Sequence, residues 1–181
     1  MKVVLSHGHY DHTGGLYPFL KKNSKAKIYV KEGIFTPKYS CRTRFIGTPF
    51  NEELLKNRLV YVDAITEITE NIFIMPDIDI YNSIDTHFKG MNIKMNNDFI
   101  PDEFDDELFH QHCDSLFAPG YYDCATASQH FKLPVSLVLG GFHMKECSDE
   151  QYDQILHYFQ LFKPESIGVC HCTGVEKFAE L

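Results

Sequence analysis

Short apolar runs and amphipathic stretches alternate along this chain of 181 residues. Seven runs of four to six residues are rich in Val, Ile, Leu and Thr and are flanked by polar or turn-forming residues, a pattern typical of β-strands. The predicted strands are residues 2–5, 27–31, 59–62, 64–69, 71–75, 135–139 and 166–170.

Two other segments place apolar residues at helical spacing and are predicted as amphipathic helices. The first spans residues 15–22, with Leu16, Phe19 and Leu20 on its apolar face. The second begins at Ser148, which forms a capping box with Gln151, and ends before Pro164. Its apolar face is formed by Tyr152, Ile155, Leu156, Phe159 and Phe162. Shorter helices are predicted at 51–57 and after Gly174, loops at 33–49 and 76–97, and an acidic stretch at 98–107.

Strands early and late in the chain, with helices between them, predict a mixed α/β (α+β) fold of two sheets sandwiched by helices. The length suits a single domain, residues 1–181, with a sizeable hydrophobic core. No apolar run is long enough to span a bilayer, so no membrane partner is expected. The net charge of −8 argues against non-specific binding to nucleic acid.

The six cysteines do not have the spacing of a small disulfide scaffold. No secretory signal is visible at the start of the chain. We therefore expect reduced thiols and a cytoplasmic location.

The strongest candidate for chemistry is a cluster of His7, His9, Asp11 and His12, in the order H-x-H-x-D-H. Neutral imidazole and carboxylate are ligands that zinc prefers. In an extended segment the side chains of His7 and His9 share a face and can bind one ion together. Asp11 and His12 are neighbours and reach a common ion only if the chain turns. The pattern therefore indicates two metal ions side by side.

Two more histidines follow predicted strands, as the first cluster does. His171 comes directly after residues 166–170, and His143 follows the strand at 135–139 and two glycines. A histidine alone is more often structural than a ligand, but this placement beside a metal motif favours a functional role. We predict that His171 binds the second metal and that His143 is a ligand or contacts the substrate.

The stretch S-H-G-H-Y-D-H-T-G-G-L, residues 6–16, resembles the signature loop of the metallo-β-lactamase superfamily of metal-dependent hydrolases. Within this superfamily, the chain resembles the branch of the dihydropterin ribofuranosylaminobenzene-phosphate synthase-like proteins. The further matching stretches are F-I-G-T-P-F, D-E-F-D-D-E-L, L-G-G-F-H-M and H-C-T-G. The resemblance implies an αββα sandwich with a two-metal site at the edge between the sheets.

The chain departs from this branch in two places. The branch has a pair of strands before the metal loop, so we expect the domain to be incomplete at the N-terminus. It also has a third ligand of the first metal in a G-C-S-H-x-G stretch, which is missing between Leu108 and Leu139. One interpretation is a reading-frame shift across about residues 110–123, where shifted codons can spell a similar motif. The alternative is a replacement ligand, for which the candidates are His110, His112 and His130.

We predict a hydrolase in which two divalent ions, preferably zinc with manganese or iron as alternatives, share a bridging hydroxide. His7 and His9 would bind the first ion, and Asp11, His12 and His171 the second. Asp11 would also orient the hydroxide, and His143 would bind a phosphate or protonate the leaving group. The expected substrate is a small phosphorylated or ester-type molecule, and a homodimer is left open. The alternative is an inactive remnant with a defective first metal site.

Overall fold

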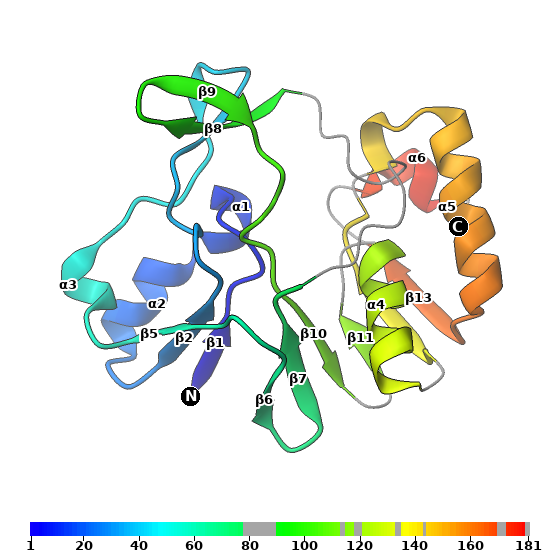
Figure 1. The fold of residues 1–181 in the computed structure, drawn as a ribbon, viewed down its shortest axis with the longest axis horizontal. Coiled ribbons are helices and arrows are strands. Elements are labelled where there is room, and N and C mark those ends of the chain that lie inside the picture. Colours follow the sequence, from blue (N-terminus) through cyan, green and yellow to red (C-terminus); the bar gives the residue numbers. More distant parts are fainter. Residues whose placement is uncertain are drawn as a thin grey trace. The chain divides into compact units, whose positions relative to one another are not determined.

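The structure is a computed structural model that describes residues 1–77, 90–112, 115–117, 121–132, 135–142, 144–169 and 173–179. Clustering of contacts divides the chain into two compact units (Figure 1). Unit 1 consists of Met1–Ile65 and Phe88–Leu108, and unit 2 of Thr66–His87 and Phe109–Leu181. Each unit is described by itself below, and the single domain expected from the sequence stays a prediction.

Unit 1 contains a parallel sheet of three strands in the order β1-β2-β5. Its strands are β1 (Lys2–Val4), β2 (Lys27–Val30) and β5 (Leu59–Tyr61), which confirms three of the predicted strands. The helices α2 (Leu16–Lys22) and α3 (Glu52–Leu55) also lie where the sequence predicts them. A buried cluster joins the sheet to these helices and is formed by Leu5, Leu16, Leu20, Ala26, Ile28, Val30, Ile34 and Leu55.

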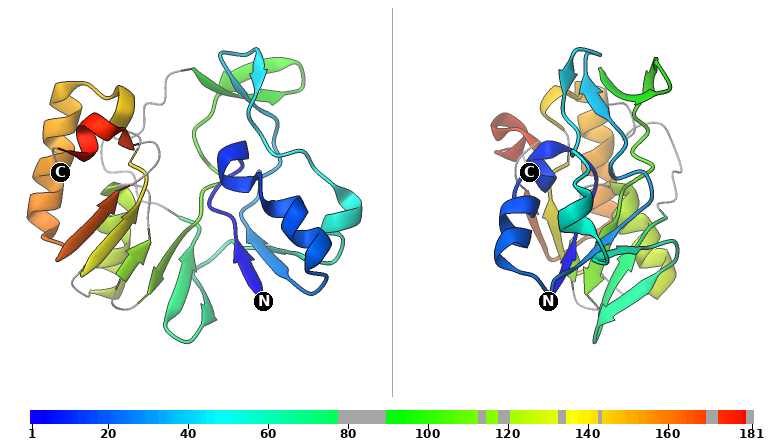
Figure 2. Two further views of the ribbon diagram at one scale, coloured as in Figure 1. Left: turned by 180° about the vertical axis from the view of Figure 1, so that it is seen from behind. Right: turned by 90° about the vertical axis from the view of Figure 1, so that its left-hand side faces the viewer.

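A second sheet of unit 1 was missed by the sequence pattern. It is antiparallel, has the order β4-β3-β8-β9 and includes a hairpin of β8 and β9 (Figure 2). Its strands are β3 (Lys38–Ser40), β4 (Arg44–Phe45), β8 (Met91–Met95) and β9 (Asp98–Pro101). The prediction of loops at 33–49 and across 91–95 is therefore wrong. These strands are short and partly polar, so backbone pairing defines them without the apolar alternation that marks a strand in sequence.

Unit 2 is built on a mixed sheet in the order β13-β12-β11-β10-β7-β6. Its first three strands in this order run parallel, and the remaining neighbours pair antiparallel. The strands are β6 (Thr66–Thr69), β7 (Ile72–Met75), β10 (Phe109–His112), β11 (Ser115–Phe117), β12 (Leu137–Gly140) and β13 (Ser166–Val169). Four of them confirm predicted strands, and β10 and β11 were not predicted.

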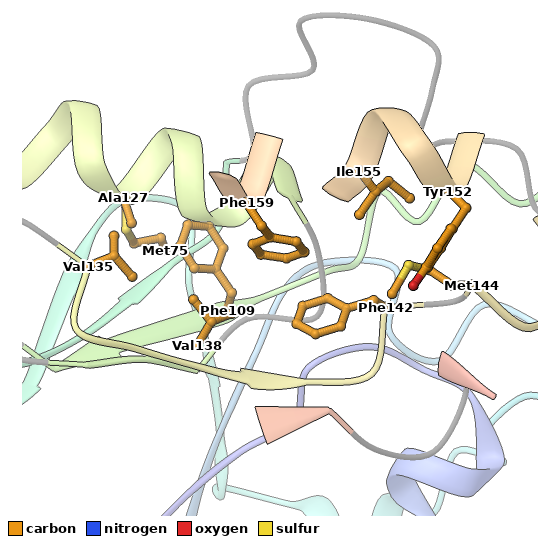
Figure 3. Close-up of a cluster of buried hydrophobic side chains, with 10 residues drawn as sticks. All are labelled: Met75, Phe109, Ala127, Val135, Val138, Phe142, Met144, Tyr152, Ile155 and Phe159. Carbon is orange, nitrogen blue, oxygen red and sulfur yellow. The ribbon is translucent and has the colours of Figure 1, made fainter. Parts of the chain in front are cut away.

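The helices of unit 2 are α4 (Tyr121–Phe131), α5 (Asp149–Phe162), α6 (Val175–Phe178) and a short 3₁₀ turn, η1 (Met144–Glu146). The predicted cap of α5 is confirmed, because the Ser148 side chain accepts a hydrogen bond from the Gln151 N–H at 3.2 Å. Figure 3 shows Tyr152, Ile155 and Phe159 of α5 in one buried cluster with side chains of the sheet. The apolar face of α5 therefore covers this sheet, as its spacing predicts.

Three further expectations bear on the chain as a whole. No helix in the described ranges is long and apolar enough to cross a membrane. Cys41 and Cys147, among the described cysteines, are thiols and not disulfide partners. The interpretation of a frame shift across about residues 110–123 is not tested by the structure and stays a prediction.

Candidate metal centre

The histidine cluster begins just beyond β1, at the C-terminal end of a strand of the parallel sheet. Hydrogen bonds fix the backbone here: the Leu5 N–H donates to the Tyr29 carbonyl at 3.1 Å, and the Leu108 N–H to the Ser6 carbonyl at 2.6 Å. His9 has an extended conformation and is the N-cap of α1 (Tyr10–Thr13). The chain thus turns into a helix directly after His9, which supplies the turn that the sequence requires.

The three imidazole rings of the motif lie against one another. The ring centroid of His7 is 4.8 Å from that of His9 and 4.1 Å from that of His12. His7 and His9 are buried, at 2% and 4% exposure, whereas Asp11 and His12 lie at the surface. The Phe104 ring packs against both buried histidines, with centroids 5.5 and 5.1 Å away. The structure therefore brings these four motif residues together within unit 1.

Ser6 holds two of these rings by the same nitrogen. Its Oγ lies 3.3 Å from Nδ1 of His7 and 3.4 Å from Nδ1 of His12. The Nε2 atom of His7 is buried, and its ring packs against that of His12. When Ser6 Oγ accepts hydrogen bonds from Nδ1 of both rings, Nε2 of each ring is the nitrogen left to coordinate an ion.

His9 is held by the opposite nitrogen, through a buried cluster of charged side chains. Its Nε2 lies 3.0 Å from Oδ2 of Asp102. The Nζ of Lys38 lies 2.9 Å from both carboxylate oxygens of Asp102 and 2.9 Å from Oδ1 of Asp106. The three charged side chains are only 2–3% exposed. We call Lys38, Asp102 and Asp106 the buried charge cluster.

The electrostatic environment of Asp102 keeps its carboxyl ionised. Burial raises its pKa, but the hydrogen bond from His9 and the positive charge of Lys38 outweigh burial and lower the pKa below its ordinary value. The Phe104 N–H, which donates to Oδ1 at 3.2 Å, acts in the same direction. Asp102 is therefore an acceptor of hydrogen bonds only.

Gly8 connects the two buried histidines and also contacts the buried charge cluster. Its N–H donates to Oδ2 of Asp106 at 2.7 Å. A Cβ atom at this position would lie 2.1 Å from the Ile34 carbonyl oxygen and 2.9 Å from Oδ2 of Asp106. Only glycine fits this close approach of two backbone segments.

One pair of candidate ligands is close enough to bind the same divalent ion. Two atoms that each lie about 2.1 Å from one zinc ion are at most about 4.2 Å apart. Nε2 of His12 and Oδ2 of Asp11 are 3.9 Å apart, within this limit. Within the part of the chain that the structure describes, however, no group of three or more His, Cys, Asp or Glu is arranged to hold an ion. His143 and His171 lie outside the described residues, so their roles as ligands stay predictions.

Two other candidates are placed by the structure only in part. His130 is exposed in the last turn of α4, and the backbones of His110 and His112 belong to β10. The choice of a replacement ligand for the first ion therefore also stays a prediction.

The sequence analysis missed the buried charge cluster. The acidic stretch 98–107 drew attention as a whole, but nothing in its pattern separates buried Asp102 and Asp106 from exposed Asp105. Lys38 lies more than sixty residues earlier in a segment predicted as a loop. Only the pairing of β3 with β8, and of β8 with β9, brings these charges together.

Three comparisons with known proteins bear on the family. The model of the metallo-beta-lactamase superfamily matches residues 1–59, which include the whole histidine cluster. The crystal structure of Tm1679, a metal-dependent hydrolase of the β-lactamase superfamily, aligns with a TM-score of 0.84 and 27% identity over 98% of this chain. The alignment covers 70% of that protein. The mixed α/β fold is therefore the metallo-β-lactamase fold, as the resemblance implies.

Two relatives come from Methanocaldococcus jannaschii. The uncharacterized protein MJ0448 is 26% identical over 99% of this chain and 71% of its own length. The 7,8-dihydropterin-6-methyl-4-(β-D-ribofuranosyl)-aminobenzene-5′-phosphate synthase is 24% identical over 95% of this chain and 66% of its own length. The chain thus spans about two thirds to seven tenths of these proteins. The match over the first 59 residues, the shared fold and these similarities relate the chain to the metallo-β-lactamase superfamily.

Proposed function

We propose that the chain is a metal-dependent hydrolase that acts on a small phosphorylated or ester-type molecule. The observation that carries this proposal is that three imidazole rings and the carboxylate of Asp11 lie close together just beyond β1. The ring centroids of His7 and His12 are only 4.1 Å apart. The superfamily and the solved structure of a metal-dependent hydrolase support the reaction class.

The proposed ligands divide by position and burial. His7 and His9 would hold the first ion from the protein interior, and Asp11 and His12 would hold the second at the surface, joined by His171. Two divalent ions bound in such a site would lower the pKa of a bound water to near neutrality. They would also stabilise the negative charge that develops on the substrate oxygen. Zinc suits the imidazole-rich donor set best, with manganese or iron as alternatives.

The chain's own residues would orient the reaction. Asp11 is exposed in the first turn of α1, so its second carboxylate oxygen can accept a hydrogen bond from the attacking water. The Phe104 ring packs against the rings of His7 and His9 and would help to hold them in place. For His143 we keep the prediction that it binds a phosphate or protonates the leaving group.

The first test is metal content together with turnover. The purified chain is stripped with a chelator, reconstituted with zinc, and assayed by plasma emission and with a generic phosphodiester and a generic lactone or thioester. We expect about two equivalents of zinc and zinc-dependent hydrolysis of one substrate class. Less than about half an equivalent, without hydrolysis, would favour the inactive remnant, because a catalytic zinc site normally has three protein ligands.

Asp11→Asn and His12→Ala are the informative variants, because both residues lie at the surface, with 34% and 29% of their side chains exposed. Each should lower the zinc content and abolish turnover while the circular dichroism spectrum stays unchanged. His157→Ala, which removes an exposed histidine of α5 outside the motif, is the matched control and should retain turnover. Full turnover in His12→Ala would contradict the proposed metal centre.

A further inference from the structure

We propose that Asp102 is a positioning residue that fixes which nitrogen of His9 faces the first metal ion, and that Lys38 and Asp106 hold it in place. The inference rests on the proposed function for the role of His9 as a ligand. Its structural part, the state of the His9 ring, can be tested without any metal.

The first step is the direction of the hydrogen bond between His9 and Asp102. The ammonium group of Lys38 lies 2.9 Å from both oxygens of Asp102, so Asp102 is a carboxylate that only accepts hydrogen bonds. The hydrogen bond between Oδ2 of Asp102 and Nε2 of His9 is therefore donated by the imidazole N–H. A neutral His9 with a proton on Nε2 carries its lone pair on Nδ1. Nδ1 is therefore the coordinating atom of His9, in contrast to His7 and His12, whose Nδ1 atoms face Ser6 Oγ.

The second step is the position of Asp102 itself. Lys38 contacts both of its oxygens at 2.9 Å, and the Phe104 N–H donates to Oδ1 at 3.2 Å. The carboxylate thus accepts hydrogen bonds from three groups at fixed positions and cannot rotate without losing them. Lys38 is the first residue of β3, and Asp102 directly follows β9, so the antiparallel sheet sets their separation.

The third step is the link to the backbone of the motif. Lys38 also contacts Oδ1 of Asp106, whose other oxygen accepts the Gly8 N–H at 2.7 Å. The ammonium group of Lys38 therefore contacts both carboxylates: that of Asp102, which accepts the hydrogen bond from His9, and that of Asp106, which accepts the one from the Gly8 peptide. The buried charge cluster positions both ligands of the first ion at once.

The fourth step is the charge of the cluster. One lysine and two carboxylates leave a net charge of minus one behind His9, at 2–3% exposure. A buried negative charge that accepts a hydrogen bond from the imidazole N–H makes the opposite nitrogen a stronger ligand for a metal ion. Loss of such outer partners typically lowers metal affinity about 10–100-fold, which is the effect we expect at this site.

The direct test is the tautomer of His9 in the metal-free wild-type chain, measured by long-range ¹⁵N–¹H NMR with the ring resonances assigned through the backbone of the wild-type chain itself. We expect the neutral ring of His9 to be the Nε2–H form. A His9 found with its proton on Nδ1 would overturn the proposal, and this measurement needs no variant that must fold.

The second test compares Asp102→Asn with Asp105→Asn. Both remove one carboxylate from the acidic stretch, but Asp105 is exposed and lies outside the cluster. In Asp102→Asn we expect mixed His9 tautomers and an affinity for Zn²⁺ about 10–100-fold weaker in a chelator competition. Asp105→Asn should match the wild type in both measurements.

The outcomes separate this inference from the proposed function. If the wild type binds no zinc but His9 is in the Nε2–H form and becomes mixed in Asp102→Asn, the proposed function fails and the positioning role stands. If the wild type binds zinc and Asp102→Asn changes neither the tautomer nor the affinity, the positioning role is wrong. If Asp102→Asn does not fold, the tautomer of His9 in the wild type decides alone whether the positioning role is right.

Discussion

Lys38 is the residue whose replacement tests the electrostatics of the centre most severely. Its side chain is 2% exposed and its ammonium group makes three contacts of 2.9 Å with two carboxylates. Lys38→Met keeps most of the volume of the side chain but removes the only cation of the buried charge cluster. Asp102 and Asp106 would then share the interior as two charges of the same sign.

The expected cost follows from the partners that remain. Asp102 keeps its hydrogen bonds from His9 and the Phe104 N–H, and Asp106 keeps the one from Gly8. Breaking a buried ion pair on one side typically costs about 3–5 kcal/mol, and these remaining donors argue against a larger value. The free energy of unfolding of most domains is only about 5–15 kcal/mol, so this loss is a large fraction of the stability expected for unit 1.

The assay is urea unfolding of the metal-free chain at neutral pH, followed by circular dichroism and tyrosine fluorescence. A loss of about 3–5 kcal/mol with a slope of about 1–3 kcal/mol per molar urea moves the midpoint down by about 1–5 M. The cost should shrink as the pH is lowered, because one carboxylate then takes up a proton and the repulsion disappears. Lys25→Met, at an exposed lysine, is the control and should change the stability by less than about 0.5 kcal/mol.

The double variant Lys38→Met with Asp106→Asn decides between charge and packing as the cause. The asparagine oxygen still accepts the Gly8 N–H, and only one buried negative charge remains. We expect the double variant to be more stable than Lys38→Met alone. If the second substitution adds a further loss of stability, the repulsion argument is refuted and Lys38 acts through packing.

Three further predictions concern separate features. Gly8→Ala should cost more than about 1–3 kcal/mol and weaken metal binding, because its Cβ would lie 2.1 Å from the Ile34 oxygen, whereas Gly15→Ala, with open space around it, should be neutral in urea unfolding. Ser148→Ala removes the cap of α5 and should lower the stability of unit 2 by about 1 kcal/mol in thermal unfolding; an unchanged transition would contradict this. Burial raises the pKa of Tyr17, so the neutral phenol stabilises the fold below about pH 10, and this contribution is lost as the pH rises through the folded pKa. Ultraviolet difference titration of the wild type against Tyr17→Phe should show one late-ionising tyrosine.

The part of the centre that is local in sequence could be predicted. His7, His9, Asp11 and His12 lie within six residues, so the rings had to be near one another once the strand and the turn were recognised. The orientation of the rings could not be predicted, because it depends on Ser6 and on carboxylates about ninety residues away. Long-range pairing of polar groups leaves no periodic trace in a single sequence.

The same distinction holds for the fold. The strands of the parallel sheet and helix α5 carry apolar positions at regular spacing, and the structure has them where they were predicted. β3 and β4 are only three and two residues long, with sequences K-Y-S and R-F. Segments this short cannot show a repeating apolar pattern. The pairing of β3 with β4 on one side and with β8 on the other stabilises them instead.

The tight seat of Gly8 has a consequence for how ions enter the centre. Its peptide lies between the Ile34 carbonyl and the Asp106 carboxylate, so the segment that carries the two inner ligands is already rigid before any ion arrives. Capture then carries little penalty from lost conformational entropy at these two side chains. The ion-free protein should therefore bind the first ion at a rate set by diffusion and dehydration of the cation, with no slow folding of the loop.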